Sequence, residues 1–205
     1  METRKTPAII YAEGTPNPLA MKFVCNRLLI GNGNTVEYKN RTQAKGSPLA
    51  LALFNFPFVT GVFITGNFVT VLKSDAVSWN DITLELREYI QQYLNDGNEV
   101  INELPQQQEN ENSNVNPLDH GVTHVEPTNE TEARIIDLLE EYIRPAVEQD
   151  GGAIYFKSYQ EGLVTLTLKG SCSGCPSSSM TLKAGIEGLL KRMIPEVQEV
   201  VAEAL

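Results

Sequence analysis

The sequence has little of several features that mark common classes of protein. Only three cysteines occur among its 205 residues, which excludes a small secreted domain framed by disulfide bonds. Its two longest apolar stretches, around residues 49–58 and 61–72, are interrupted by Asn, Thr, Pro or Gly. Neither reaches the roughly 20 apolar residues that a membrane-spanning helix needs. We therefore expect neither an integral membrane protein nor a membrane partner.

Basic residues are also scarce. The chain has 16 Lys and Arg against 26 Asp and Glu, which gives a formal net charge of −10. Nucleic acid is a poor partner for such a chain, because phosphate binding needs clustered Lys and Arg. The first residues have neither the apolar core of a secretory signal nor the Arg- and Ser-rich helix of an organellar presequence. The sequence predicts a cytoplasmic protein that does not bind nucleic acid.

Apolar residues make up 41% of the chain, which is enough to form a core, and the length fits two small domains. The clearest boundary is a Gln/Asn/Glu-rich stretch at 104–117 that is closed by prolines. Such a segment cannot bury enough surface to offset its ordering entropy, so it is typical of a flexible linker. We expect an N-terminal domain over 1–104, a flexible polar linker over 105–127 and a C-terminal domain over 128–205.

The first domain has the alternation of apolar residues that is typical of strands, followed by the spacing of a long amphipathic helix. Its expected elements are a β-hairpin of 21–30 and 35–38 turning at the Asn-Gly repeats, a helix at 47–54 capped by Ser47, a strand pair of 59–65 and 67–73 turning at Gly66, and a helix from Asp81 to Asp96-Gly97.

The second domain is predicted to have the order αββαβ, so the fold class is α+β: two small mixed α/β domains joined by the flexible polar linker. Alternation in one strand, with Val164, Leu166 and Leu168 on one side, predicts a buried sheet face. Its expected elements are a helix behind Thr128 or Asn129 that kinks at Pro145 and ends at 150–152, a hairpin of 153–159 and 163–169, a helix over 182–193, and a last strand at 197–201.

The residues that carry chemistry lie between the second hairpin strand and the last helix. Cys172 and Cys175 form a Cys-x-x-Cys motif, whose spacing can point two sulfurs at one ion or cluster, and Gly174 lets the backbone fold tightly between them. The helix that follows directs unpaired N–H groups and a positive dipole end at this site. Such a position lowers thiol pKa values and offsets the charge of a thiolate-ligated centre.

Four interpretations of this pair stay open on the residues alone. A structural zinc site needs four ligands, whereas Cys25 lies in the other domain and His120 and His124 lie in the linker. A dithiol oxidoreductase normally places its motif in a larger βαβ framework, and two buried or disulfide-linked cysteines without a function are the plainest alternative. An all-cysteine iron–sulfur cluster needs four thiolates, so two chains would have to share one cluster.

At these residues the chain resembles the C-terminal domain of NifU-like (Nfu-type) proteins, and its first half resembles the N-terminal domain of the same family. The only visible departure is Ala153, where the family often has an acid after the Gly-Gly pair. The matching runs of the second domain are Arg144–Gly152, Cys172–Ser178, Thr181–Glu187 and Ile194–Val197, and those of the first are Thr15–Pro18, Met21–Phe23, Ser47–Ala50, Leu53–Phe54, Gly61–Val62 and Trp79.

The resemblance implies an iron–sulfur cluster scaffold or carrier rather than an enzyme. Cys172 and Cys175 take the family's ligand positions for a labile [4Fe-4S] cluster, with [2Fe-2S] as the other form, shared by two chains in a homodimer. The implied partners are upstream cluster-assembly proteins as donors and apo iron–sulfur proteins as recipients. The N-terminal domain is expected to be a partner-docking or regulatory module. A dithiol oxidoreductase and a zinc-binding interaction module are the alternatives.

Three other side chains have simpler expected roles. Cys25 follows apolar residues in a strand-like run and is expected to be a buried small hydrophobe. His120 and His124 lie among acids and are expected to be exposed to solvent. Tyr155 is expected to belong to the hairpin rather than to a cofactor site.

Overall fold

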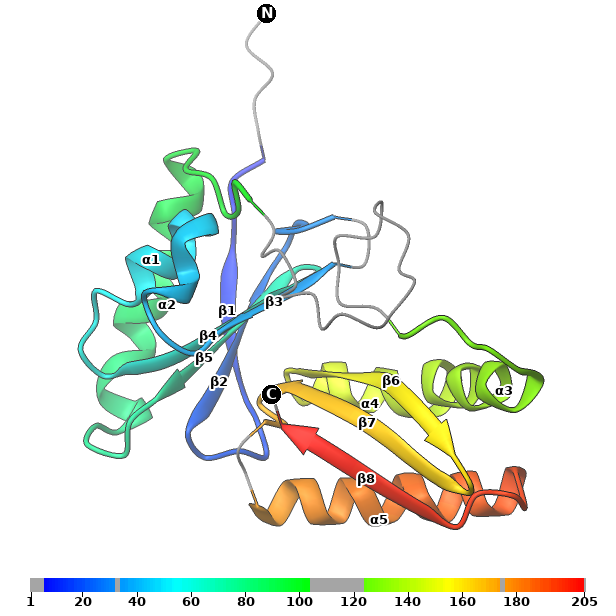
Figure 1. Cartoon of the computed structure of the whole chain (residues 1–205). Coiled ribbons are helices and arrows are strands. Elements are labelled where there is room, and N and C mark those ends of the chain that lie inside the picture. Colours follow the sequence, from blue (N-terminus) through cyan, green and yellow to red (C-terminus); the bar gives the residue numbers. More distant parts are fainter. Residues whose placement is uncertain (1–5, 32–33, 104–123, 174–175, 205) are drawn as a thin grey trace, which may run out of the picture.

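The computed structural model describes residues 6–31, 34–103, 124–173 and 176–204, which form two α+β domains (Figure 1). This confirms the predicted fold class. Residues 104–123, which include most of the linker expected at 105–127, lie outside the described residues, so the exact domain limits stay predictions. Within the described part of the chain, no helix is long and apolar enough to cross a membrane.

The N-terminal domain is a five-stranded antiparallel sheet in the order β1-β2-β5-β4-β3. Figure 1 shows helices α1 and α2 on one side of this sheet and the C-terminal domain on the other. The elements are β1 (Ile10–Gly14), β2 (Ala20–Cys25), β3 (Thr35–Tyr38), a 3-10 turn (Gln43–Gly46), α1 (Pro48–Leu53), β4 (Val59–Thr65), β5 (Phe68–Lys73) and α2 (Trp79–Asn95).

Both faces of this sheet are covered, because alternate residues of its strands belong to two different buried clusters. Phe23 and Ile64 pack beneath the helices, together with Leu86 of α2. Their neighbours on the opposite face, Val24 and Phe63, pack against the C-terminal domain. The near-continuous burial of β2, β4 and β5 follows from this double cover.

Three local signals in the N-terminal domain are confirmed: one helix cap, one strand turn and one helix end. The Ser47 side chain accepts the Ala50 N–H and so caps α1. Strands β4 and β5 pair around Gly66, whose φ of 43° suits a glycine at a tight turn. Helix α2 ends before Gly97, which has a φ of 80°.

The predicted hairpin between 21–30 and 35–38 is wrong. Strand β2 pairs with β1 and β5, whereas β3 pairs only with β4 at the other edge of the sheet. The reason lies at Asn26, whose N–H and side chain bond to the backbone of Ile9 and end the strand. Leu29 then donates its N–H to the Gly66 carbonyl, which leads the chain across the β4–β5 turn. The Asn-Gly residues 32–33 lie outside the described residues.

The C-terminal domain has the predicted order αββαβ. Its sheet has the order β6-β7-β8, in which β6 and β7 are antiparallel and β8 runs parallel to β7. Its elements are α3 (Glu130–Leu138), a π-helical turn (Leu139–Ile143), α4 (Arg144–Gln149), β6 (Gly152–Gln160), β7 (Leu163–Gly170), α5 (Pro176–Met193) and β8 (Glu199–Ala204).

One buried cluster joins the helices of this domain to its sheet, with Leu139 and Val147 from the first helical run, Ile186 and Leu190 from α5, and Leu166 from β7. The irregularity expected at Pro145 takes the form of the π-helical turn that comes directly before α4, because proline has no N–H for the helical ladder. The core therefore fixes β7 and α5, the two elements that flank the Cys-x-x-Cys motif.

Reciprocal hydrogen bonds cap the start of α3, at the position where the sequence predicts a cap by Thr128 or Asn129. The Asn129 side chain accepts the Glu132 N–H, and the Glu132 carboxylate accepts the Thr128 N–H and hydroxyl. This arrangement resembles a capping box, except that the carboxylate binds the residue before the cap, and it confirms the predicted helix start.

Candidate functional site

The cysteine loop joins the end of β7 to the start of α5, as the sequence predicts. Strand β7 ends at Gly170, which has a φ of 68°, and Cys172 follows two residues later. Helix α5 begins at Pro176. Cys172 is therefore placed beside a helix start, whereas Cys175 lies outside the described residues and its place next to Cys172 stays a prediction.

The loop is held by the turn that ends α4. Ser171 donates its N–H to the Gly151 carbonyl at 3.2 Å and its hydroxyl to the Asp150 carbonyl. Within the loop, the Ser173 hydroxyl donates to the Gly170 carbonyl at 2.8 Å. The Asp-Gly-Gly turn and the cysteine loop therefore form one hydrogen-bonded unit, although about 20 residues separate them in sequence.

The Cys172 sulfur lies against the first residue of β6. A Cβ atom added at Gly152 would lie 2.7 Å from Cys172 Sγ and 2.7 Å from the Lys169 carbonyl oxygen, closer than real contacts allow. Cys172 is 7% exposed and belongs to the buried cluster of its domain. The second glycine of the Gly-Gly pair therefore makes room for the sulfur, which explains why a glycine stands there.

A carboxylate from the other domain also contacts this loop. Glu37 of β3 accepts the Gly170 N–H at 2.9 Å through Oε1, and the same oxygen lies 3.0 Å from the Ser173 hydroxyl, whose one proton it shares with the Gly170 carbonyl. Burial raises the pKa of Glu37, and the two hydrogen bonds and the Lys169 ammonium oppose that rise. Burial likewise lowers the pKa of Lys169, although Glu37 raises it. Sequence reasoning missed Glu37, because 136 residues separate it from Ser173 and no local pattern marks it.

The expected exposure is wrong for His124, whose side chain is 12% exposed; His120 lies outside the described residues. His124 Nδ1 accepts the Phe156 N–H at 2.8 Å, and Nε2 pairs with Glu140. An accepting Nδ1 means that the neutral ring carries its proton on Nε2. His124 therefore ties the chain before α3 to strand β6, a long-range contact that an acidic, polar sequence neighbourhood does not reveal.

The His124 contacts predict a pH dependence of stability. Burial, as the largest cause, lowers the pKa of His124, against the opposing effect of Glu140. Because the folded pKa lies below the unfolded one, the unfolded chain takes up the proton first as pH falls. The stabilisation by neutral His124 is complete above the unfolded pKa of about 6.5 and is lost as pH falls from that value through the lower folded pKa.

We therefore expect the melting temperature of the protein to fall between pH 7.5 and 5.5 by more than that of the His124→Gln variant, measured by circular dichroism. Glutamine keeps a side-chain acceptor for the Phe156 N–H and has no titrating group. An equal fall in melting temperature over this pH range in the two proteins would contradict the assigned role of His124.

The expectations for Cys25 and Tyr155 are confirmed. Cys25 is 1% exposed and belongs to the core of the N-terminal domain, so it is a buried small hydrophobe. Tyr155 is 4% exposed and packs between hairpin and N-terminal sheet. Among the described residues, no group of three or more His, Cys, Asp and Glu side chains is placed to hold a metal ion.

Comparison with protein families finds two matches. Residues 10–97 match the family described as "Scaffold protein Nfu/NifU N terminal", and residues 135–201 match the "NifU-like domain". The two ranges leave unmatched mainly the predicted linker and the chain ends. The second range includes both Cys172 and Cys175.

Similar curated proteins include one from Drosophila sechellia named "NFU1 iron-sulfur cluster scaffold homolog, mitochondrial", which is 38% identical over 191 residues, 93% of this chain. A protein of the same name from Drosophila persimilis is 37% identical over 196 residues, 96% of this chain. The chain covers 63% and 65% of the lengths of these two relatives.

Among solved structures, a NifU-like protein from Saccharomyces cerevisiae, determined by solution NMR, is 29% identical. That match covers 49% of this chain and 91% of the other, with a TM-score of 0.43.

Proposed function

The chain belongs to the Nfu/NifU family of scaffold proteins, and from that premise we propose that it carries an iron–sulfur cluster and delivers it to apo iron–sulfur proteins. The observation that carries the proposal is the position of Cys172, on a loop between a strand end and a helix start inside the NifU-like domain. The named relatives, of which this chain spans less than two thirds, support the same cargo.

The number of available thiolates sets the stoichiometry of the proposed complex. An all-cysteine [4Fe-4S] cluster needs four thiolates, and each chain supplies two, Cys172 and Cys175. Two chains would therefore hold one cluster between them, as a homodimer that depends on its cargo. A [2Fe-2S] cluster held by the same four thiolates is the other form that this ligand set allows.

The surroundings of the loop suit an anionic cargo. Helix α5 spans 18 residues, and its first N–H groups, which have no partner within the helix, point toward the loop. Hydrogen bonds to thiolate-ligated clusters and nearby dipoles stabilise their negative charge. The residues on either side of Cys172, Ser171 and Ser173, are small, and their hydroxyls bind within the loop unit and to Glu37.

Transfer then proceeds by ligand exchange. A cysteine of the apo-recipient loses its proton and forms an Fe–S bond, and the bond from Cys172 or Cys175 to the same iron breaks. The departing thiolate takes up the released proton. Each exchange replaces one thiolate by another, so neither the cluster nor the protein is oxidised or reduced. On this account the protein acts as a carrier and not as an enzyme.

A transfer assay tests this function. Cluster-loaded protein, mixed anaerobically with an apo-enzyme that requires [4Fe-4S], is expected to restore that enzyme's activity even when a strong iron chelator is present. The chelator captures free iron, so its lack of effect marks direct transfer. Activation that the chelator abolishes would mean that the protein only releases iron. A dithiol oxidoreductase would instead reduce a disulfide substrate without any cluster.

The compartment and the partners complete the proposal. We propose a cytoplasmic protein with cluster-assembly proteins as donors, no nucleic acid or membrane partner, and an N-terminal domain that acts as a docking or regulatory module. The two named relatives carry the word mitochondrial in their names. Fractionation of cells that express the untagged protein decides between the two compartments.

A further inference from the structure

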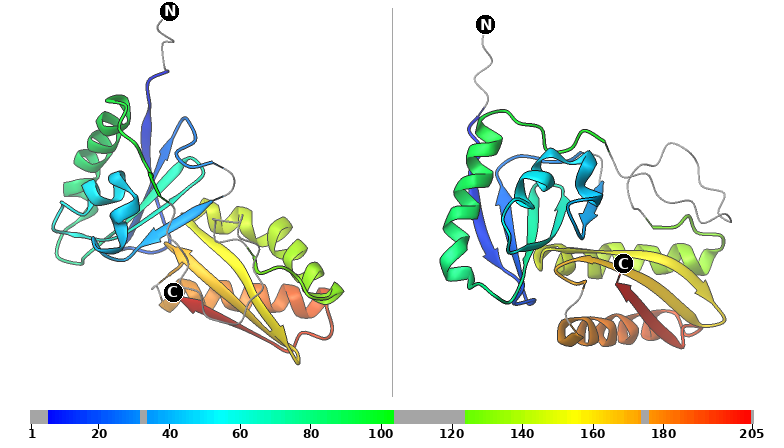
Figure 2. Two further views of the ribbon diagram at one scale, coloured as in Figure 1. Left: turned by 45° about the horizontal axis from the view of Figure 1, so that its top comes forward. Right: turned by 60° about the vertical axis from the view of Figure 1, so that its left-hand side comes forward.

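The two domains meet through the sheet face that the N-terminal helices leave uncovered. Figures 1 and 2 show the base of the β6–β7 hairpin against this face in every view. An apolar cluster lies at the contact, formed by Val24, Phe63 and Phe68 of the N-terminal sheet and by Ala153 and Tyr155 of β6. All five side chains are at most 6% exposed, so the contact excludes water.

Polar side chains of the N-terminal domain surround this cluster and bind mainly the backbone of the cysteine-loop unit. Thr70 Oγ1 donates to the Gly151 carbonyl at 2.7 Å, and Asn17 Nδ2 donates to the Ser171 carbonyl at 2.9 Å. Lys22 Nζ donates to a third carbonyl, that of Gln149, at 3.3 Å. These contacts are specific to the turn and the loop that position Cys172.

Two glycines of this unit allow the sheet to come close. A Cβ atom at Gly151 would lie 3.0 Å from Thr70 Oγ1 and 3.3 Å from Lys22 Cβ, and one at Gly170 would lie 2.9 Å from Phe63 Cδ1. Both glycines also have positive φ angles, of 80° and 68°. The backbone of the loop unit is therefore shaped to receive the other domain as well as to turn.

Glu37 connects this contact to the cysteine loop itself. Its carboxylate accepts hydrogen bonds from Gly170 and Ser173, residues on either side of Cys172. Ser173 also stands between the two cysteines of the motif. A docked Glu37 therefore occupies donors of the loop and places a negative charge beside the thiolates that would receive an anionic cluster.

We propose that the N-terminal sheet is a docking surface for the cysteine loop of its own chain, and that docking competes with cluster uptake. Glu37 is the positioning residue that holds the loop in the docked form. The competition rests on the proposed function, because the loop donors that Glu37 occupies, and the charge that it brings, lie beside the cysteines that would hold the cluster. Docking itself rests only on the contacts between the domains.

The Gly170 amide reports docking, because its N–H donates to a side chain of the other domain. In the full-length, reduced and cluster-free protein, the hydrogen of this amide is expected to exchange with solvent several-fold faster in the Tyr155→Phe variant than in wild type. The change removes the 2.6 Å hydrogen bond between Tyr155 and Thr35, which does not touch Gly170, so any effect passes through docking. Loss of one such bond corresponds to about a fivefold change.

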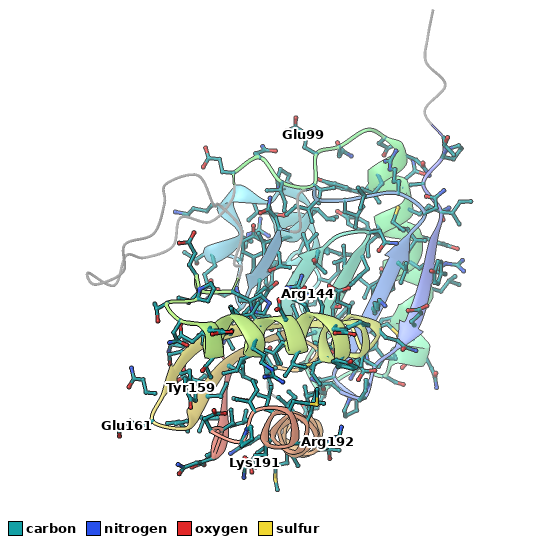
Figure 3. The ribbon with its side chains drawn as sticks, turned by 90° about the vertical axis from the view of Figure 1, so that its right-hand side faces the viewer. Glu99, Arg144, Tyr159, Glu161, Lys191 and Arg192 are labelled. Atoms are coloured by element: carbon teal, nitrogen blue, oxygen red, sulfur yellow. The ribbon has the colours of Figure 1, made fainter. Side chains whose placement is uncertain are left out.

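Tyr159→Phe is the matched control. Tyr159 is also in β6 and its hydroxyl donates to the Glu196 carbonyl at 3.3 Å within its own domain. Figure 3 shows it toward the hairpin tip, away from the N-terminal domain. In Tyr159→Phe, the Gly170 amide hydrogen is expected to exchange at the wild-type rate. Equal rates in Tyr155→Phe and Tyr159→Phe would overturn the docking surface.

Cluster uptake tests the competition. During anaerobic reconstitution with iron and sulfide, Glu37→Gln and Tyr155→Phe are expected to acquire cluster several-fold faster than wild type. Two controls, Tyr159→Phe and the exposed-site change Glu88→Gln, are expected to acquire it at the wild-type rate. Uptake that is unchanged or slower, with faster Gly170 exchange in Tyr155→Phe, would overturn the competition. If every protein stayed colourless while the Gly170 amide still exchanged faster in Tyr155→Phe, the carrier function would be overturned and docking would remain supported.

Discussion

Replacing either Cys172 or Cys175 by serine is expected to abolish stable cluster binding while the fold is retained. A serine hydroxyl stays protonated near neutral pH and cannot take the place of a thiolate ligand. In a dimer, one substitution removes two of the four ligands at once. The fold should persist, because serine is close in size to cysteine and the core of the domain includes many other side chains.

The measurement is iron and sulfide content after anaerobic reconstitution, with circular dichroism to follow the fold. Cys25→Ala is the control, because Cys25 lies in the core of the other domain and is expected to leave the cluster content unchanged. A single Cys172 or Cys175 variant that still holds a full cluster would show that the four-thiolate dimer is wrong.

The Gly152→Ala variant is expected to lose most of its cluster although both cysteines remain. The added Cβ would lie 2.7 Å from Cys172 Sγ and from the Lys169 carbonyl, so the sulfur and the strand end must move. Overpacking of this kind costs about 1–3 kcal/mol of stability. The expected result is a lower melting temperature together with a cluster content well below that of wild type.

Gly185→Ala is the matched control for this change. Gly185 lies in α5, and nothing stands within 4 Å of the position of its added Cβ. Alanine in place of an exposed helical glycine is expected to stabilise the helix by about 1 kcal/mol and to leave cluster binding intact. A Gly152→Ala protein that binds as much cluster as Gly185→Ala would contradict the role assigned to the Gly152 contact.

Much of the C-terminal domain was predictable, because its signals are local. The cap at Asn129 acts on a residue three positions later, and the hairpin of β6 and β7 turns within two residues, Glu161 and Gly162. The cysteine loop was predictable for the same reason: a strand with alternating apolar residues ends at Gly170, just before Cys172, and a helix with apolar spacing begins at Pro176, just after Cys175.

The features that the sequence did not reveal all depend on contacts between distant residues. The Asn-Gly hairpin prediction failed because β5 pairs with β2 in the place expected for β3. The His124 contact to β6 spans 32 residues, and the Glu37 contact to the loop spans 133 or more. No local periodicity encodes such pairs, so the domain contact and its link to the cysteine loop became visible only in the folded chain.

The central claim is that two chains carry one cluster between their cysteine loops. Its most direct test is the iron and acid-labile sulfide content of anaerobically reconstituted protein, determined together with the molar mass of the same sample by light scattering. We predict about two iron and two sulfide per chain in a dimer, the ratio for one four-iron cluster shared by two chains. Protein that stays free of iron and sulfide after reconstitution would contradict the carrier function, and a full cluster on a monomer would contradict the shared site.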